Sequence, residues 1–369
     1  MAVSGILRRW APFAFAAVAF AVTAPPSLGA DLSAADYRFS GPYTHENLTV
    51  FLVHGKPGLA GKPPITLQEA LQRGLVRVIE TGSVNQLEVE NVGADAVFIQ
   101  SGDIVKGGQQ DRVLSVDLIL PPRSGKVSIA SFCVEQGRWA PRDKEDAKTF
   151  SRSATMLPSR EMKIAARAPL MAANTPTPQS STGGRRVQAN DAAGSVGSSQ
   201  GKVWRGVADM QEKLKRNVGV TVAAPQSASS LQLSMENEAL KKTTGAYVTA
   251  LAGAVDGTPD AIGFVFAING QINSADVYGA PELFRKMWPK LLQASTIEAV
   301  AERKDGASPA APSVDAVRAF LSAAESGKRA DRQLAHGVTI ETRDADKAQL
   351  LESRAGTGGG YVHRSYVLK

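Results

Sequence analysis

Short apolar runs separated by turn residues dominate the chain from Leu48 to about Val134. Six runs rich in Val, Ile and Leu are broken at close intervals by Gly, Pro and Asn, a rhythm typical of an antiparallel sandwich or an open barrel. The runs are Leu48–Val53, Leu75–Thr81, Leu87–Asn91, Ala96–Gln100, Arg112–Leu120 and Lys126–Phe132. One short helix is predicted over Leu67–Arg73. Thr66 and Glu69 form its capping box, and Gly74 ends it.

Residues 142–201 depart from this pattern. Their central part, Ala172–Gly201, consists almost wholly of Ser, Thr, Gly, Pro, Asn, Gln and Ala, with one basic pair at Arg185 and Arg186. Such a composition buries too little apolar surface to order itself. We therefore expect 142–201 to be a flexible low-complexity linker or loop.

Helical spacing replaces the strand pattern after residue 201. Two sets of mainly apolar residues recur at three- and four-residue steps, which predicts two helix faces. The first set is Trp204, Val207, Gln211, Leu214 and Val218, and the second is Leu240, Thr244, Tyr247, Leu251 and Val255. A further helix is predicted after Pro312 and Ser313, with Gly327 as its end.

The pair Asn269-Gly270 gives the strongest local signal. It separates Ile262–Ile268 from Gln271–Val277, and Asn-Gly readily supplies the two positive φ angles of a type I′ hairpin. Pro281 then fits the first position of a helix, which Pro289 is expected to break or kink. The chain ends in three predicted strands, which are Gly337–Thr342, Ala348–Ser353 and Tyr361–Leu368.

Together these elements predict an α+β protein. An N-terminal antiparallel β-sandwich or open barrel occupies residues 31–141, the linker or loop 142–201, and a mixed helix and strand region 202–369. The chain length fits roughly two domains of ordinary size. No internal repeat is visible in the sequence.

The first 30 residues have the order of a secretory signal peptide. Arg8 and Arg9 precede the apolar run Ala11–Val22, and small residues then lead to a cleavage position near Gly29 or Ala30. The run is too short to span a bilayer, and no other long apolar segment follows. We expect a periplasmic or secreted protein without a membrane span after signal removal. An uncleaved anchor is the alternative.

Composition argues against a nucleic-acid partner. The 42 basic and 35 acidic residues give a net charge of +7, but they are interspersed along the chain, so no nucleic-acid partner is expected.

Cys133 is the single cysteine, and burial in an apolar strand would raise its pKa, which predicts an unreactive thiol. The four histidines lack the spacings of a zinc site, and His363 is interpreted as structural. No metal and no cofactor is predicted. Asp276 is either catalytic or a helix cap.

The region Ser101–Trp139 carries the densest group of candidate ligand contacts. Two glycine-containing turns rich in charged residues flank the run Val113–Pro121, and Gly107-Gly108 lets a ligand approach the backbone. The predicted ligand-binding residues are Asp103, Lys106, Asp111, Arg112, Glu135 and Arg138. They meet only if the two flanking strands pair. The structural alternative is a tight turn whose charges pair with one another, for example Arg112 with Glu135.

Several segments together resemble one known family. They are Asn47–Gly55, Ser101–Arg112, Cys133–Trp139, Gln200–Trp204 and the run from Ile268 through Asp276 and Glu282 to Leu292. The family is named for its association with ADP-ribosylglycohydrolases and rhodanese-phosphatases, and the likeness extends from about Asn47 to the C-terminus apart from Ala172–Gly201. Its motifs carry no established chemistry, so no catalytic residue is transferred. The name implies a link with nucleotide or ADP-ribose metabolism by association only.

Three functions are compatible with these observations. The first is an exported, non-enzymatic protein that binds an anionic or polar ligand, such as a nucleotide, sugar or peptide group, at the turns of the β-domain. The second is a hydrolase, linked by the family name to ADP-ribose or nucleotide metabolism, in which Asp111 or Glu135 is the general base. The third is an envelope structural or interaction module with a wide apolar surface patch.

Overall fold

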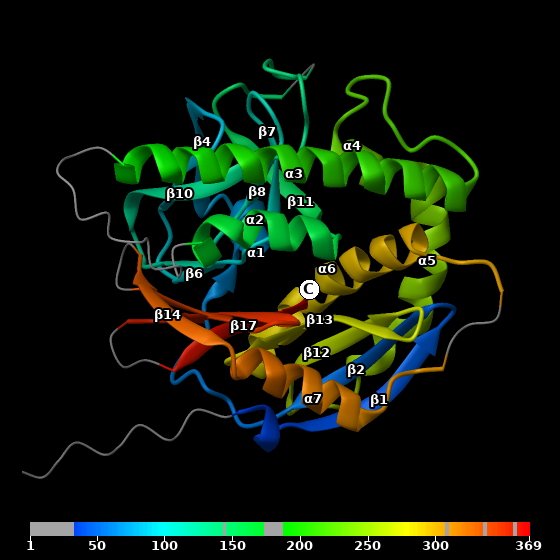
Figure 1. Cartoon of the computed structure of the whole chain (residues 1–369). Coiled ribbons are helices and arrows are strands. Elements are labelled where there is room, and N and C mark those ends of the chain that lie inside the picture. The colour runs from blue at the N-terminus through cyan, green and yellow to red at the C-terminus, as the bar shows by residue number, and fades with distance from the viewer. Residues whose placement is uncertain (1–32, 143–144, 173–186, 307–309, 335–337, 357–359) are drawn as a thin grey trace, which may run out of the picture. The chain divides into compact units, whose positions relative to one another are not determined.

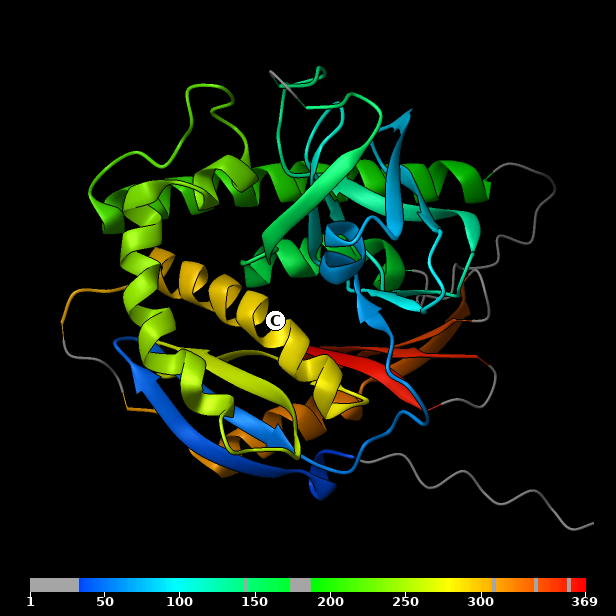
Figure 2. The ribbon, with the colours of Figure 1, turned by 180° about the vertical axis from the view of Figure 1, so that it is seen from behind.

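The structure, a computed structural model, describes residues 33–142, 145–172, 187–306, 310–334, 338–356 and 360–369. Asp31–Lys369 forms one compact unit. The predicted signal peptide, residues 1–30, lies outside the described residues. Figures 1 and 2 show the elements from two opposite sides. No described helix is both long and apolar enough to cross a membrane.

The largest sheet has eight strands, each antiparallel to its neighbours, in the order β1-β2-β12-β13-β17-β16-β15-β14. The strands are β1 (Arg38–His45), β2 (Leu48–His54), β12 (Ala261–Ile268), β13 (Gln271–Tyr278), β14 (Lys328–Gln333), β15 (Thr339–Asp344), β16 (Ala348–Arg354) and β17 (Tyr361–Leu368). Because β1 and β2 come from the predicted β-rich region, this sheet joins residues from both sides of the predicted 142–201 linker.

Two smaller sheets are formed by residues 65–156. One has six strands in the order β11-β7-β8-β10-β5-β4, and the other has three in the order β3-β6-β9. The strands are β3 (Ile65–Thr66), β4 (Val76–Ser83), β5 (Gln86–Asn91), β6 (Val97–Ile99), β7 (Asp103–Gly107), β8 (Arg112–Leu114), β9 (Leu118–Leu120), β10 (Gly125–Cys133) and β11 (Phe150–Met156). Their shared core also contains Ile340 and Leu351 of the large sheet. The predicted α+β class is confirmed.

Helices cover both faces of the large sheet (Figure 1). They are α1 (Leu67–Gln72), α2 (Arg160–Ala172), α3 (Val187–Val218), α4 (Leu231–Met235), α5 (Glu238–Leu251), α6 (Pro281–Ala301) and α7 (Val314–Glu325), with the short 3-10 turns η1 (Ala34–Asp36) and η2 (Ala252–Val255). Strand β2 shows the consequence, because all of its residues are buried. Leu48, Val50 and Leu52 pack in the core with α3, α5 and α6, whereas Phe51 and Val53 pack in the core with α7.

Helix α6 lies against β12 through aromatic side chains. The Phe264 ring stacks on Phe284, with centroids 6.5 Å apart, and meets Trp288 edge-on at 5.6 Å. Pro281 is the first residue of α6, as predicted, but Pro289 does not end the helix. Most residues of α6 are buried, so packing outweighs the backbone hydrogen bond that a proline inside a helix forfeits.

Several local predictions are confirmed in atomic detail. Thr66 and Glu69 form the capping box of α1. Asn269 and Gly270 have φ angles of 52° and 74° between β12 and β13. The Ser313 hydroxyl caps α7.

The prediction of a flexible 142–201 segment is wrong for its described part. It contains β11, α2 and the first turns of α3, while residues 173–186 lie outside the described residues. The Gln200 side chain explains how a polar segment is ordered, since its amide donates to the Cys133 carbonyl and accepts from the Cys133 N–H, both at 2.9 Å. The Gln200 amide thus makes the same two backbone hydrogen bonds with β10 that a neighbouring strand would make.

Two strand predictions also need correction. Arg112–Leu120 is not one strand but β8 and β9, which belong to different sheets. Asp103–Gly107, read from its glycines as part of a turn, forms strand β7 between β8 and β11. Positive φ angles fall at Gly102, just before this strand, and at Gly107 and Gly108 at its end, so the glycine turns flank the strand.

Candidate functional site

The two predicted polar turns do meet, and they meet around Asp111. This carboxylate is fully buried. Its Oδ1 accepts from Arg142 at 2.7 Å and from the Gly107 N–H at 3.0 Å, and its Oδ2 accepts from Arg142 and from the Ser230 hydroxyl, both at 3.0 Å. Burial raises the pKa of Asp111, with a contribution from the nearby Glu135 charge, although Arg142 opposes the shift.

Glu135 completes this ion cluster. Its carboxylate lies 2.7 Å from the Arg138 guanidinium and 3.4 Å from that of Arg142, and it accepts the Asp111 N–H at 3.2 Å. Burial alone would raise the pKa of Glu135, but Arg138 and hydrogen bonds with Ser227 and the Asp111 backbone lower it. Glu145 also accepts from Arg142 at 2.9 Å, so three carboxylates and two arginines neutralise one another in this cluster.

Arg112 is also fully buried, but its partner is not Glu135. The guanidinium donates to the Gln110 carbonyl at 2.8 Å and to Glu80 at 3.4 Å, and it lies 5.6 Å from the Trp139 ring centroid. The predicted Arg112–Glu135 pair is thus replaced by Arg112–Glu80, because the β8–β10 register sets Arg112 opposite Cys133.

The remaining two predicted residues pair with helices. Lys106 binds Glu236 at 2.8 Å, just beyond α4, and the buried Asp103 forms an ion pair with Lys290 of α6. None of the six predicted residues lines any of the three hollows described below. The structure brings Asp111, Glu135 and Arg138 together and leaves Asp103 and Lys106 in separate contacts.

His363 and Asp276 lie in a second buried polar network. His363 bridges two carboxylates, with Nδ1 2.7 Å from Asp117 and Nε2 3.1 Å from Asp276. Burial lowers the pKa of His363, but the two aspartates outweigh burial and raise it to about 9. The imidazolium is therefore charged at neutral pH and joins β17, β13 and the segment before β9. Asp276 does not cap α6, whose N-cap is Ala280, and it lines none of the three hollows described below.

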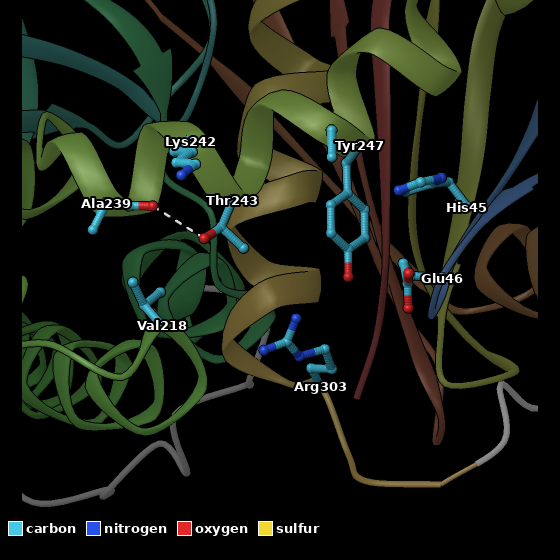
Figure 3. Close-up of a pocket in the computed structure, with 9 residues that line it drawn as sticks. His45, Glu46, Val218, Ala239, Lys242, Thr243, Tyr247 and Arg303 are labelled. Atoms are coloured by element: carbon cyan, nitrogen blue, oxygen red, sulfur yellow. Dashed lines mark hydrogen bonds between the residues drawn. The ribbon is translucent and has the colours of Figure 1, made fainter.

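Three hollows surround the C-terminal end of α6, and we call them together the α6 groove. The first, of about 460 Å³, lies between α5, the β1–β2 turn and Arg303 (Figure 3). The second, of about 560 Å³, lies between the end of α3 and residues 301–305. The third, of about 100 Å³, lies between the start of α2, the β12–β13 hairpin and Glu298. Arg303 lines the first two hollows, and Glu302 and Lys304 line the second and third.

Basic side chains outnumber acidic ones on the walls of the first two hollows, where the acidic residues are Glu46, Glu302 and Asp305. Lys213 forms an ion pair with Glu302. Four other basic residues on these walls, all exposed, have no carboxylate partner within the part of the chain that the structure describes. They are Arg216, Lys242, Arg303 and Lys304.

Local structure fixes the walls of the first hollow. Glu46 adopts a φ of 51° in the β1–β2 turn, which sets His45 edge-on against the Tyr247 ring at 4.9 Å. The Tyr247 hydroxyl donates to Asn47 at 2.9 Å, and burial raises its pKa. In Figure 3 the Tyr247 hydroxyl points toward the space between Glu46 and Arg303. Tyr247, which was predicted as part of a helix face, thus packs in the hydrophobic core and also lines the first hollow.

The end of α6 is held by two asparagine amides. Asn217 of α3 donates to the carbonyls of Val300 and Ala301, both at 2.8 Å. Asn269 of the β12–β13 hairpin donates to the Glu302 carbonyl at 2.7 Å. Carbonyls that a helix end leaves without partners are satisfied in this way, so the chain leaves α6 in a fixed direction at the groove.

Glu298 is the most unusual side chain of the α6 groove. It is 2 % exposed, and its Oε1 accepts from the Arg160 N–H and from the Asn273 amide, both at 2.9 Å. Its Oε2 is buried without a hydrogen-bond partner. Burial raises the pKa of Glu298 to about 7, against the opposing effect of Lys163. Nothing in the spacing of the sequence singles this residue out.

Within the described residues no group of three or more His, Cys, Asp or Glu side chains is arranged to hold a metal ion. The Cys133 thiol is buried, and burial raises its pKa to about 12, which matches a core residue.

The fold and the groove define an α+β protein with a charged surface groove at the end of a buried helix. A family model described as the ARG and Rhodanese-Phosphatase-superfamily-associated Protein domain matches residues 36–367. The chain belongs to this family, as the resemblance in its sequence indicated. No curated protein and no solved structure matches the chain significantly.

Proposed function

We propose that the protein binds a small anionic ligand in the α6 groove. The observation that supports this is the set of four exposed cations, Arg216, Lys242, Arg303 and Lys304, which lack carboxylate partners among the described residues. Guanidinium and ammonium groups favour phosphate and carboxylate ligands. The ligand class is the one expected from the sequence, but the proposed contacts lie on α3, α5 and the end of α6 rather than on the β-turns.

Three of these cations have a competing structural explanation. Arg303 and Lys304 follow the C-terminal end of α6, and Arg216 lies on the last turn of α3, where positive charge complements the helix dipole. Lys242 lies within α5. Lys242 therefore separates ligand binding from helix stabilisation most clearly.

Isothermal titration calorimetry with inorganic phosphate and with ADP-ribose tests the proposal. We expect binding to the purified protein, weakened about three- to tenfold by Lys242→Ala and by Arg303→Ala, because each removes one charge-assisted contact. Lys328→Ala is the matched control, since Lys328 is an exposed cation on β14, at the opposite edge of the sheet from β1. Absence of binding, or an equal loss in Lys328→Ala, contradicts the proposal.

The export of the protein is part of this proposal. Its support is the order of residues 1–30, and the expected product begins near Ala30 or Asp31. Cell fractionation followed by N-terminal sequencing of the periplasmic or secreted protein checks it. Recovery of the intact N-terminus in the cytoplasm contradicts it.

The two alternative functions have less support from the geometry. Asp111 and Glu135, the general bases expected for a hydrolase, are paired with arginines and line none of the three hollows. The exposed large apolar side chains among the described residues come from four separate parts of the chain, which does not favour a wide interaction patch. They are Val92, Trp139, Val220 and Val314.

A further inference from the structure

The first hollow of the α6 groove holds charges of both signs that the protein does not pair with one another. Glu46, Lys242 and Arg303 all line this hollow, and all three are exposed. Within the described part of the chain Glu46 forms no ion pair, although two cations share the hollow with it. A ligand can therefore reach a carboxylate and two cations from solvent without displacing any contact of the protein.

The opposite charges act on one point of the hollow, which is the Tyr247 hydroxyl. In Figure 3 Glu46 and Arg303 lie on different sides of this hydroxyl. Burial raises the pKa of Tyr247, and the Arg303 charge lowers it while the Glu46 charge raises it, so both groups lie near the phenol. Arg303 also donates to the Asn217 carbonyl, which holds the guanidinium in place while its other N–H groups stay available.

The size and the remaining lining of the first hollow suit a small ligand with a short hydrocarbon part. The volume of about 460 Å³ falls within the range of about 300–1,000 Å³ that is usual for small-molecule sites. Val218, Ala239 and Ala246 contribute aliphatic side chains to the walls. Methylene groups that join two charged ends of a ligand can contact such a wall.

We propose that the first hollow binds a phosphate monoester that also carries a primary amine, with Lys242 and Arg303 holding the phosphate and Glu46 holding the ammonium. This inference rests on the proposed anion binding and specifies its ligand class. Two cations match a phosphate dianion, and one carboxylate matches one ammonium. A phosphate diester or a simple amino acid offers the two cations only one negative charge.

Three probes separate the amine from the phosphate. Phosphoethanolamine carries both groups, propyl phosphate has a methyl group in place of the amine, and glycerophosphoethanolamine is a diester with the same amine. Calorimetric titration of each into wild type at pH 8 compares them. We expect phosphoethanolamine to bind about five- to tenfold more tightly than either of the other two ligands.

The variant Glu46→Gln removes the proposed partner of the ammonium and keeps both cations. We expect its affinity for phosphoethanolamine to fall about five- to tenfold, whereas its affinity for propyl phosphate should stay within about twofold of wild type and so show that the hollow is intact. Glu238→Gln is the matched control, because Glu238 is an exposed carboxylate of α5 that lines none of the three hollows. It should bind both ligands as wild type does.

The outcomes separate this inference from the proposed anion binding. If wild type binds phosphoethanolamine no more tightly than propyl phosphate, or if Glu46→Gln weakens both alike, the ammonium site is wrong and anion binding in the α6 groove stands. Equal binding of the diester overturns the monoester. An equal loss of phosphoethanolamine in Glu238→Gln overturns the role of Glu46, because net charge would then explain the effect. If neither these ligands nor inorganic phosphate bind wild type, both proposals fail.

Discussion

The buried carboxylates of Asp111 and Glu298 differ in how their two oxygens are hydrogen-bonded. Asp111 receives donors on both carboxylate oxygens from Arg142 and its neighbours. Glu298 has both of its donors on one oxygen. The first arrangement stabilises the structure only as long as every partner is present, whereas the second lowers stability because one buried acceptor has no partner.

Glu298→Gln should therefore stabilise the protein above neutral pH. Its carboxyl has a pKa near 4.5 when unfolded and about 7 when folded, so the ionised form costs folding free energy above pH 7 and nothing below pH 4.5. We expect the variant to gain about 3 kcal/mol over wild type at pH 8 and about nothing at pH 4.5. Denaturant unfolding across this range measures it. Glu161→Gln is the control, because the lowered pKa of Glu161 predicts a change of opposite sign.

His363 should show the reverse dependence. Its pKa is raised from 6.5 to about 9 by Asp117 and Asp276, so its contribution is complete below pH 6.5 and is lost as the pH rises through 9. His363→Gln leaves two buried carboxylates without their cation, and we expect it to cost about 3–5 kcal/mol near pH 6.5.

Unfolding of His363→Gln and wild type at pH 6.5 and 9.5 checks this prediction. The difference between the two proteins should narrow at the higher pH. His45→Gln serves as the control, since His45 is half-exposed and a substitution there should change stability by less than about 0.5 kcal/mol. A constant difference at both pH values would mean that His363 is neutral in the folded protein.

At the scale of elements, one side chain anchors the polar start of α3. Gln200 is 5 % exposed and makes both hydrogen bonds to the Cys133 backbone. Gln200→Ala leaves a buried N–H and a buried carbonyl unpaired, and we expect a loss of about 2–3 kcal/mol. Hydrogen exchange at the Cys133 amide should accelerate. Lys202→Ala, at an exposed neighbouring position, should change neither the stability nor the exchange.

The elements that the sequence predicts well are those whose signals are local. The Asn269-Gly270 hairpin depends on two φ angles, and the α1 capping box depends on residues three positions apart. The elements predicted wrongly depend on distant partners. The polar residues before Lys202 are helical because Gln200 reaches β10, and α6 passes Pro289 because the sheet buries it.

The candidate site divides in the same way. The meeting of the Ser101–Arg112 and Glu135–Trp139 segments follows from strand pairing and could be expected, but the identity of each ion pair could not. Arg142 and Ser230 complete the Asp111 cluster from distant positions in the chain. The α6 groove is lined by residues from the β1–β2 turn, α2, α3, α5 and α6. Residues so far apart in the chain leave no spacing pattern in a single sequence, so the groove could not be predicted.

At the scale of the whole molecule, the large sheet ties the ends of the chain together. Strand β12 pairs with β2 on one side and β13 on the other, so β2 lies between the edge strand β1 and the strands from the C-terminal part of the chain. Leu48, Val50 and Leu52 belong to one core of the sheet, and Phe51 and Val53 to the other. Removing β2 opens both cores at once and exposes the edge of β12.

We therefore expect residues 31–369 to unfold in one cooperative transition, and residues 202–369 expressed alone to lack a fixed tertiary structure. Burying the five apolar side chains of β2 contributes about 1.5–3 kcal/mol each, which together is comparable to the usual net stability of a domain. Differential scanning calorimetry of the longer chain, and dispersion of amide signals in NMR spectra of both, measure these outcomes. Two resolved transitions, or a well-dispersed spectrum for 202–369, would show that the C-terminal strands fold without β2.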